Sequence, residues 1–295
     1  MSLTTRRTAA AALAGALVGA AGWASTLPAS AHLPAAAPEA KRPPGPRPLR
    51  RAHAHNDYEH PRPLHDALSH GFTSVEADIH LVDGRLLVAH DPVDLDPART
   101  LEALYLDPLA ALVKAHHGSV HPGDHGAFQL LVDIKTQGVE TYLALHRALH
   151  PYRWMLSTYR DGRVRRGAVT PVVSGDRAAR TPMEAQRTRY AFYDGRLDDL
   201  GTAAPASFIP LISSNWTESF GWQGSGPFPR AERDKLHALV RAAHRRGQRV
   251  RFWGTPDVPG PAREALWREL LAAGVDHLNT DDLAALEKFL RTYDR

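Results

Sequence analysis

Residues 75–91 read VEADIHLVDGRLLVAHD and set acidic and imidazole side chains two positions apart inside an apolar run. In a β-strand, side chains alternate between the two faces, so Glu76, Asp78 and His80 share one face. Carboxylates this close repel one another unless a cation or a proton lies between them. The pattern therefore indicates either a metal site or a solvated edge on which the acids pair with arginines.

The elements that must position these side chains alternate along the chain. Short apolar runs of β type are separated by amphipathic segments with helical spacing, which is the pattern of a parallel sheet. The expected strands are 50–55, 72–78, 128–134, 169–174, 189–193, 207–212, 249–253 and 275–279; the expected helices are 62–70, 101–114, 139–150, 231–246, 261–273 and 282–292. Eight strands with outer helices predict an α/β fold, a single-domain TIM (β/α)8 barrel. An Asp-Gly pair at 83–84 predicts a hairpin after the second strand.

A barrel places its functional residues at the carboxyl ends of the strands. Polar residues gather at those ends in this sequence. They are His53 and His55 on the first strand, Glu76 and Asp78 on the second, Asp133 and Lys135 on the third, Trp253 on the seventh, and Asn279 with Asp281 on the eighth. Because acids and histidines are otherwise rare inside the expected strands, this distribution favours a site at one end of the barrel.

The two ends of the chain and its composition limit the class of protein to which it can belong. Arg6 and Arg7 precede an Ala-rich apolar run at 8–24 and small residues at 29–31, so we expect an export signal over 1–31 and a secreted or extracytoplasmic protein. A Pro/Ala-rich linker is expected over 32–48 and the barrel over 49–295. The sequence has no cysteine, which excludes thiolate chemistry. A net charge of +4 from scattered arginines favours anionic substrates and predicts no nucleic-acid partner.

Several segments carry a resemblance to a known family. They are HAHNDY, VEADIHLVDG, LLVDIKT, SNWTESFGW, FWGTPD and GVDHLNTDDL, spread from His53 to Leu283. Together they resemble the glycerophosphodiester phosphodiesterase and phospholipase C-like superfamily of barrels, and most closely its altered-inheritance-of-mitochondria branch. The usual HRG of glycerophosphodiesterases is HAH here, and the acidic ENT segment is absent, so the resemblance leaves glycerol-specific recognition open.

The resemblance implies a role for each matching residue. Glu76, Asp78 and Asp133 match the carboxylates that hold a divalent cation, and His53 and His90 match the two acid/base histidines. His53 is preferred to His55 because an asparagine, Asn56, follows it three places on, as in the spider-venom type sphingomyelinases. The implied substrate-binding residues are Asn56, Lys135, Trp253 and Asn279.

Physical chemistry supports the same function. Oxygen ligands without thiolates favour Mg²⁺ or Ca²⁺, and two histidines suit proton transfer during phosphodiester cleavage. We therefore predict an exported, metal-dependent phosphoric diester hydrolase acting on glycerophosphodiester or (lyso)phospholipid-type substrates. We expect a monomer, and transient contact with a membrane surface stays open. Two alternatives remain: a metal-dependent amidohydrolase, whose barrel also begins with His-x-His, and a non-catalytic barrel that binds a ligand.

Overall fold

The computed structural model describes residues 45–294, and over this range strands and helices alternate along the chain. The main sheet is formed by β1 (Leu49–Ala54), β2 (Phe72–Val82), β3 (Arg85–Val88), β4 (Phe128–Ile134), β7 (Val169–Gly175), β9 (Phe192–Gly195), β10 (Leu211–Asn215), β11 (Arg249–Trp253) and β12 (His277–Thr280). A small separate sheet contains β5 (Thr158–Arg160), β6 (Arg163–Arg165) and β8 (Thr188–Arg189).

The helices are α1 (His65–Ser69), α2 (Asp107–Ala115), α3 (Gly138–Leu149), α4 (Arg180–Ala185), α5 (Trp216–Ser219), α6 (Arg230–Arg245), α7 (Pro261–Ala273) and α8 (Leu283–Tyr293). A π-helical segment, Glu102–Leu106, leads into α2. The limits of α7 follow from its sequence, because Pro261 starts the helix and Gly274 ends it in a left-handed conformation with φ 84°.

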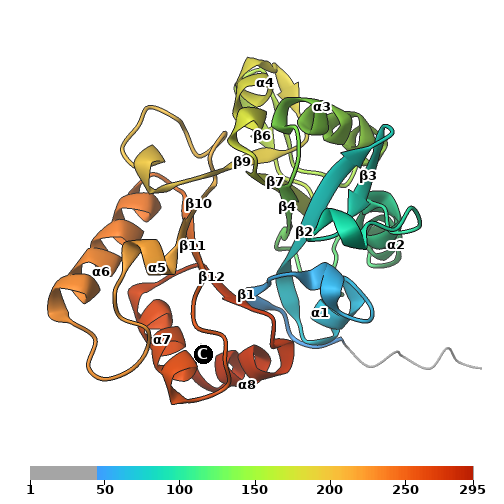
Figure 1. Ribbon diagram of the computed structural model, residues 1–295. Helices are drawn as coiled ribbons and strands as arrows, with labels where there is room; N and C mark the ends of the chain where they lie inside the picture. Colours follow the sequence, from blue (N-terminus) through green and yellow to red (C-terminus); the bar gives the residue numbers. More distant parts are fainter. Residues whose placement is uncertain (1–44, 295) are drawn as a thin grey trace, which may run out of the picture. The chain divides into compact units, whose positions relative to one another are not determined.

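Eight parallel strands close into a ring. Their order is β1-β12-β11-β10-β9-β7-β4-β2, and β1 also pairs with β2. Figure 1 shows this ring along its axis, with the helices outside it. The predicted TIM barrel is therefore confirmed.

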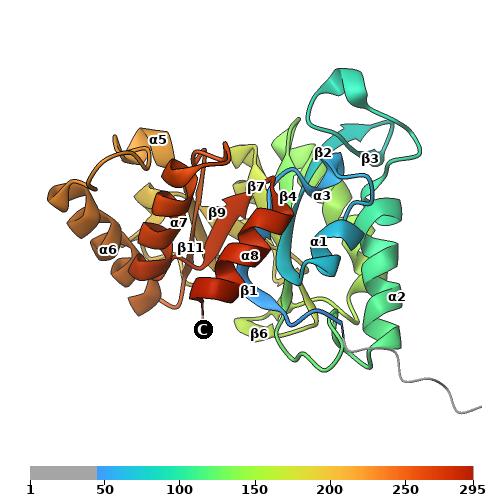
Figure 2. The same cartoon turned by 90° about the horizontal axis from the view of Figure 1, so that it is seen from below.

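The predicted hairpin is also present, with β3 antiparallel to β2 (Figure 2). Asp83 and Gly84 connect the two strands with φ angles of 47° and 79°. Both angles lie in the left-handed region that this tight turn requires, which explains the Asp-Gly pair.

Two predicted strands were misplaced. The fifth lies at Phe192–Gly195 instead of 189–193, and the sixth at Leu211–Asn215 instead of 207–212. Arg189 belongs to the small sheet, where its guanidinium lies 3.8 Å from the centre of the Tyr159 ring. Before β10, Phe208 closes a turn on Pro205, so the apolar run 207–210 packs as a loop. The small sheet itself was missed because its arginine-rich segments show no apolar alternation.

The aromatic residues of the segment 215–222 form part of the core. Trp216 is fully buried, its ring centre lies 4.2 Å from that of Phe220, and it meets the Phe252 ring edge-on. Trp222 stacks on the Phe228 ring, as Trp216 stacks on the Phe220 ring. These side chains therefore pack a loop onto the barrel. Within residues 45–294, no helix is both long enough and apolar enough to cross a membrane.

The interior of the barrel is divided by residue type. Leu131, Val172, Phe192 and Leu211, from β4, β7, β9 and β10, form a small apolar cluster separate from the main core. Leu131 lies two residues before Asp133, so both face the lumen. On the other side of the lumen, β1, β2 and β11 contribute polar and charged side chains. This polar half leads up to the carboxyl ends of the strands.

The predicted export segment, 1–31, lies outside the described residues, as does the predicted linker up to residue 44. The limits proposed for these segments stay predictions.

Candidate active site

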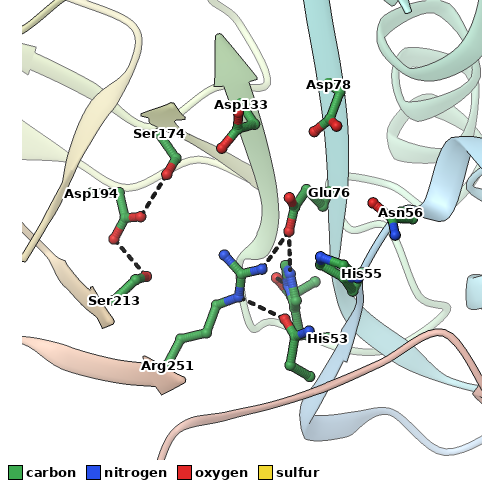
Figure 3. A network of polar contacts seen from close by, with 12 residues as sticks. His53, His55, Asn56, Glu76, Asp78, Asp133, Ser174, Asp194, Ser213 and Arg251 are labelled. Atoms are coloured by element: carbon green, nitrogen blue, oxygen red, sulfur yellow. Dashed lines mark hydrogen bonds and ion pairs between the residues drawn. The ribbon is translucent and has the colours of Figure 1, made fainter. Parts of the chain in front are cut away.

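Three carboxylates meet at the carboxyl end of the barrel. Glu76 and Asp78 come from β2, and Asp133 comes from β4, where it pairs in register with Asp78. One oxygen from each lies within 4.8 Å of the others, and Figure 3 shows the three side chains on adjoining strands. Glu76 and Asp78 are buried and Asp133 is partly buried. The structure thus brings together all three of the predicted metal ligands.

The two oxygens of Asp78 have different surroundings. Oδ2 accepts a hydrogen bond from the Tyr58 hydroxyl at 2.6 Å and lies 3.0 Å from His90 Nδ1. The Lys135 ammonium lies 2.8 Å from the same oxygen. Oδ1 is buried and has no hydrogen-bond partner within the described part of the chain. A buried carboxylate oxygen without a partner is costly, so Oδ1 is suited to coordinate a cation.

The charges around the cluster also favour a bound cation. Burial and the neighbouring Glu76 raise the pKa of Asp133 to about 6, against the opposing charge of Lys135, whose Nζ lies 3.2 Å from Asp133 Oδ1. Burial alone would raise the pKa of Glu76, but the Arg251 charge and the His53 hydrogen bond hold it below its usual range. Crowded oxygen donors without sulfur fit a hard divalent cation.

His53 does not lie where the predicted acid/base role needs it. Its side chain is fully buried below the carboxylates, with Nδ1 2.7 Å from Ser74 Oγ and Nε2 3.2 Å from Glu76 Oε2 (Figure 3). Burial, reinforced by the charge of Arg251, lowers the pKa of His53 to about 3. With both ring nitrogens engaged and no exposure, His53 supports Glu76, and this placement counts against the preference for His53.

His55 and His90 share a different arrangement. The Nδ1 of His55 lies 2.9 Å from Asp281 Oδ1, and the Nδ1 of His90 lies 3.0 Å from Asp78 Oδ2. Their side chains are 28% and 53% exposed. In each ring Nε2 has no protein partner among residues 45–294, so it is available for proton transfer. Burial opposes the charging of His55, but the Asp281 hydrogen bond and the Glu76 charge outweigh it and raise its pKa.

Three of the four predicted substrate-binding residues separate into two groups, and the fourth, Lys135, lies beside Asp78 and Asp133. Asn279 is buried, and its Oδ1 accepts a 2.8 Å hydrogen bond from Arg251 Nε, so it holds the guanidinium that pairs with Glu76. This position does not expose Asn279 to a substrate. Asn56 and Trp253 lie at the mouth and are partly buried, and Asn56 accepts a hydrogen bond from Tyr58.

Sequence reasoning missed two residues of this site. Arg251 forms a buried ion pair with Glu76, and Tyr58 donates to Asp78. Arg251 carried a signal, because it alternates with Arg249 and Trp253 on one face of an expected strand, where a cation is as unusual as an acid. Tyr58 had no signal beyond its place in the HAHNDY segment.

A second polar network faces this cluster across the lumen. Asp194, at the end of β9, is fully buried and accepts hydrogen bonds from Ser174 Oγ at 2.8 Å and Ser213 Oγ at 2.7 Å (Figure 3). Arg196 pairs with the same carboxylate at 2.8 Å. With these partners Asp194 is fully engaged, in contrast to Asp78.

Comparison with known proteins agrees with this geometry. Residues 47–194 match the AIM6-like phosphodiesterase domain, and residues 249–284 match the glycerophosphoryl diester phosphodiesterase family. "Altered inheritance of mitochondria protein 6" from Eremothecium gossypii is 33% identical over 82% of this chain and 69% of its own length. The homolog from Arthroderma benhamiae is 30% identical over 80% of this chain and 82% of its own.

The chain belongs to the AIM6-like phosphodiesterase family. The predicted relationship to the phosphodiesterase superfamily, nearest this branch, is therefore confirmed. A solved phosphatidylinositol-specific phospholipase C from Listeria monocytogenes is similar over 83% of this chain and 84% of its own, at 10% identity and a TM-score of 0.44.

One prediction is contradicted by the comparison. The relatives of this AIM6-like chain are named for altered inheritance of mitochondria, which points away from a secreted protein. The predicted secreted or extracytoplasmic location is therefore wrong. The charged and apolar pattern at 1–31 misled the prediction, because paired arginines before an Ala-rich run are not specific to export.

The amidohydrolase alternative finds no support at the barrel mouth. It requires histidine ligands on the fifth and sixth barrel strands, whereas β9 and β10 carry Asp194 and Ser213 near their carboxyl ends. Among the described residues, the group able to hold a metal ion is the carboxylate cluster alone. The geometry and the family therefore agree on phosphodiester chemistry.

Proposed function

We propose that this AIM6-like protein is a metal-dependent phosphodiesterase in which His55 and His90 are the acid/base pair. The observation that carries the proposal is the common arrangement of these two histidines. Each ring is held through Nδ1 by a carboxylate and offers Nε2 at the mouth, beside the buried carboxylate cluster. Proton transfer needs histidines with one nitrogen oriented and the other free.

In this proposal the carboxylates Glu76, Asp78 and Asp133 hold the divalent cation. When bound, the cation supplies a Lewis acid for a phosphoryl oxygen. One histidine removes a proton from the attacking oxygen, and the other delivers a proton to the leaving oxygen. Lys135, 24% exposed at the edge of the cluster, stabilises negative charge on the phosphate.

The substrate class follows from the family and the composition of the site. We infer glycerophosphodiester or (lyso)phospholipid-type phosphodiesters, because the match to the glycerophosphoryl diester phosphodiesterase family, residues 249–284, includes Trp253 at the mouth. A half-buried indole offers an apolar wall for a head group or a glycerol backbone. We propose residues 49–295 as the catalytic domain, and a monomeric state stays a prediction.

The experiment is turnover by the purified protein on a panel of phosphodiesters, before and after chelation and with Mg²⁺ or Ca²⁺ restored. We expect chelation to abolish activity and one of the two ions to restore it. Asp78→Asn should abolish metal-dependent turnover, whereas Asp91→Asn, a matched change at an exposed acid nearby, should leave it intact. Turnover that survives chelation and Asp78→Asn would contradict the metal role. Metal binding without turnover on the panel would favour the non-catalytic alternative.

A further inference from the structure

A cavity of about 730 Å³ lies at the amino-terminal end of the barrel, opposite the carboxylate cluster. Its walls come from the first residues of β4, β7, β9 and β11 and from β6 of the small sheet. Figure 2 shows β6 at the lower end of the barrel and the β2–β3 hairpin at the upper end. This volume is in the range of small-molecule sites in proteins.

The charge in this cavity is of one sign. Arg249 and Arg166 line it, and the described residues around it include no aspartate or glutamate. The polar groups beside the arginines include the hydroxyls of Ser157 and Thr170 and the imidazole of His125. Two guanidinium groups that share a cavity repel each other unless an anion lies between them.

Arg249 is held in place without a carboxylate. Its Nη2 donates to Gln129 Oε1 at 2.6 Å, and its Nη1 lies 3.0 Å from His277 Nε2. Because arginine stays protonated, His277 accepts this bond through Nε2 and is neutral. Among the residues that the structure describes, no carboxylate lies within ion-pair distance of Arg249. Burial lowers the pKa of Arg249 against the opposing charge of the more distant Asp276, and the charge of Arg166 adds to the lowering.

The partners of Arg249 are themselves fixed. Gln129 is buried and donates from Nε2 to Ser74 Oγ at 2.9 Å, and Ser74 in turn contacts His53. Buried amide and imidazole groups thus orient the guanidinium of Arg249, and its other N–H groups have no protein partner among residues 45–294. The guanidinium is therefore a preorganised fork for an oxyanion.

The apolar cluster of Leu131, Val172, Phe192 and Leu211 lies between this cavity and the carboxylate end of the lumen. An anion at Arg249 therefore occupies a different place from a substrate at the carboxylate cluster. The inference is also independent of the proposed function, since it uses none of the groups assigned to catalysis.

We propose that the amino-terminal cavity is a second binding site, which takes a small molecule bearing an oxyanion, either phosphate or carboxylate, between Arg249 and Arg166. The guanidinium of Arg249 donates forked hydrogen bonds to the oxyanion. The hydroxyls of Ser157 and Thr170 lie 2.8 Å apart on the same walls, and this pair has one O–H left to donate to it.

The test measures binding of inorganic phosphate, and separately of acetate, to the full-length, EDTA-treated protein by calorimetry and by the shift in Tm. A saturable rise in Tm is expected for the wild type, because a ligand that binds only the folded state stabilises it. The anion that binds more tightly identifies phosphate or carboxylate as the natural group. Arg249→Met should weaken binding about tenfold or more, since charge-assisted forked bonds are the strong ones.

Three further variants place the site. Arg230→Met, a matched change at a 95% exposed arginine on α6, should bind as the wild type does. Lys135→Met, at the carboxylate cluster, should also retain binding. Arg166→Gln, on the rim, should weaken binding and decides the matter if Arg249→Met does not fold. The proposal would be overturned if the wild type showed no saturable binding, if Lys135→Met alone lost binding, or if a folded Arg249→Met bound as the wild type does. If Arg249→Met does not fold, unchanged binding in Arg166→Gln would overturn it.

Discussion

The two histidines of the HAH segment should respond to substitution in opposite ways. His53→Ala removes a fully buried ring that bonds Ser74 and Glu76. Leaving one buried polar group unpaired costs about 1–3 kcal/mol, and the cavity adds to this. Each kcal/mol lowers Tm by about 2–4 °C in a domain of this size, so a fall of several degrees is expected.

His55→Ala should have little effect on stability and a large effect on turnover. The side chain is 28% exposed and pairs with an aspartate that is 54% exposed, and such a pair contributes about 0–1 kcal/mol. Loss of a positioned proton-transfer group costs roughly 10²–10⁴-fold in rate. His90→Ala, which removes the other free Nε2, should show the same combination.

The assay is turnover on a phosphodiester that the wild type cleaves, with Tm and metal content measured on the same samples. His60→Ala serves as a control, because this nearby histidine is partly exposed and lies outside the cluster. Near-normal turnover in folded, metal-loaded His55→Ala would refute the reasoning. A stable His53→Ala that has lost turnover would show that the buried histidine, and not the exposed one, transfers the proton.

Three further changes test the surroundings of the site and the core. Arg251→Met should raise the pKa of Glu76 and weaken metal binding, because it removes the ion pair that holds this carboxyl charged. Calorimetry measures the metal affinity. Burial raises the pKa of Asp57 from 3.8 to about 7, so its contribution to stability is fully present below about pH 4 and is lost as the pH rises through about 7. Asp57→Asn should flatten that decline in a denaturant titration across this range. Trp216→Ala should cost about 3–5 kcal/mol in denaturant unfolding, because it empties a fully buried aromatic contact and removes the Nε1 bond to the Trp222 carbonyl.

Each of these changes has a result that would count against it. Unchanged metal affinity in Arg251→Met would show that the ion pair does not tune Glu76. A pH profile in Asp57→Asn identical to the wild type would place the titration elsewhere. A loss below about 1 kcal/mol in Trp216→Ala would mean that the loop does not depend on its aromatic packing, since surface changes have effects of that size.

The sequence by itself determined the barrel, the end of the barrel that carries the site, and the three carboxylates. These follow from local rules: alternation in strands, helical spacing between them, and the gathering of acids at strand ends. Glu76 and Asp78 are two residues apart, so their common face is decided by the chain alone. The Asp83-Gly84 turn was predictable for the same reason, because its φ angles demand those residue types.

The choice between His53 and His55 was decided only by the tertiary structure. His53 lies in β1 and His55 directly follows its last residue, Ala54, and their spacing to Asn56 does not show which of them is at the mouth. The depth of each ring depends on neighbours from distant segments: Ser74 and Glu76 enclose His53, and Asp281 orients His55. The cavity at Arg249 likewise needs β4, β6, β7 and β11 to meet. Burial and charge pairing are properties of strands brought together by barrel closure, and no local pattern contains them.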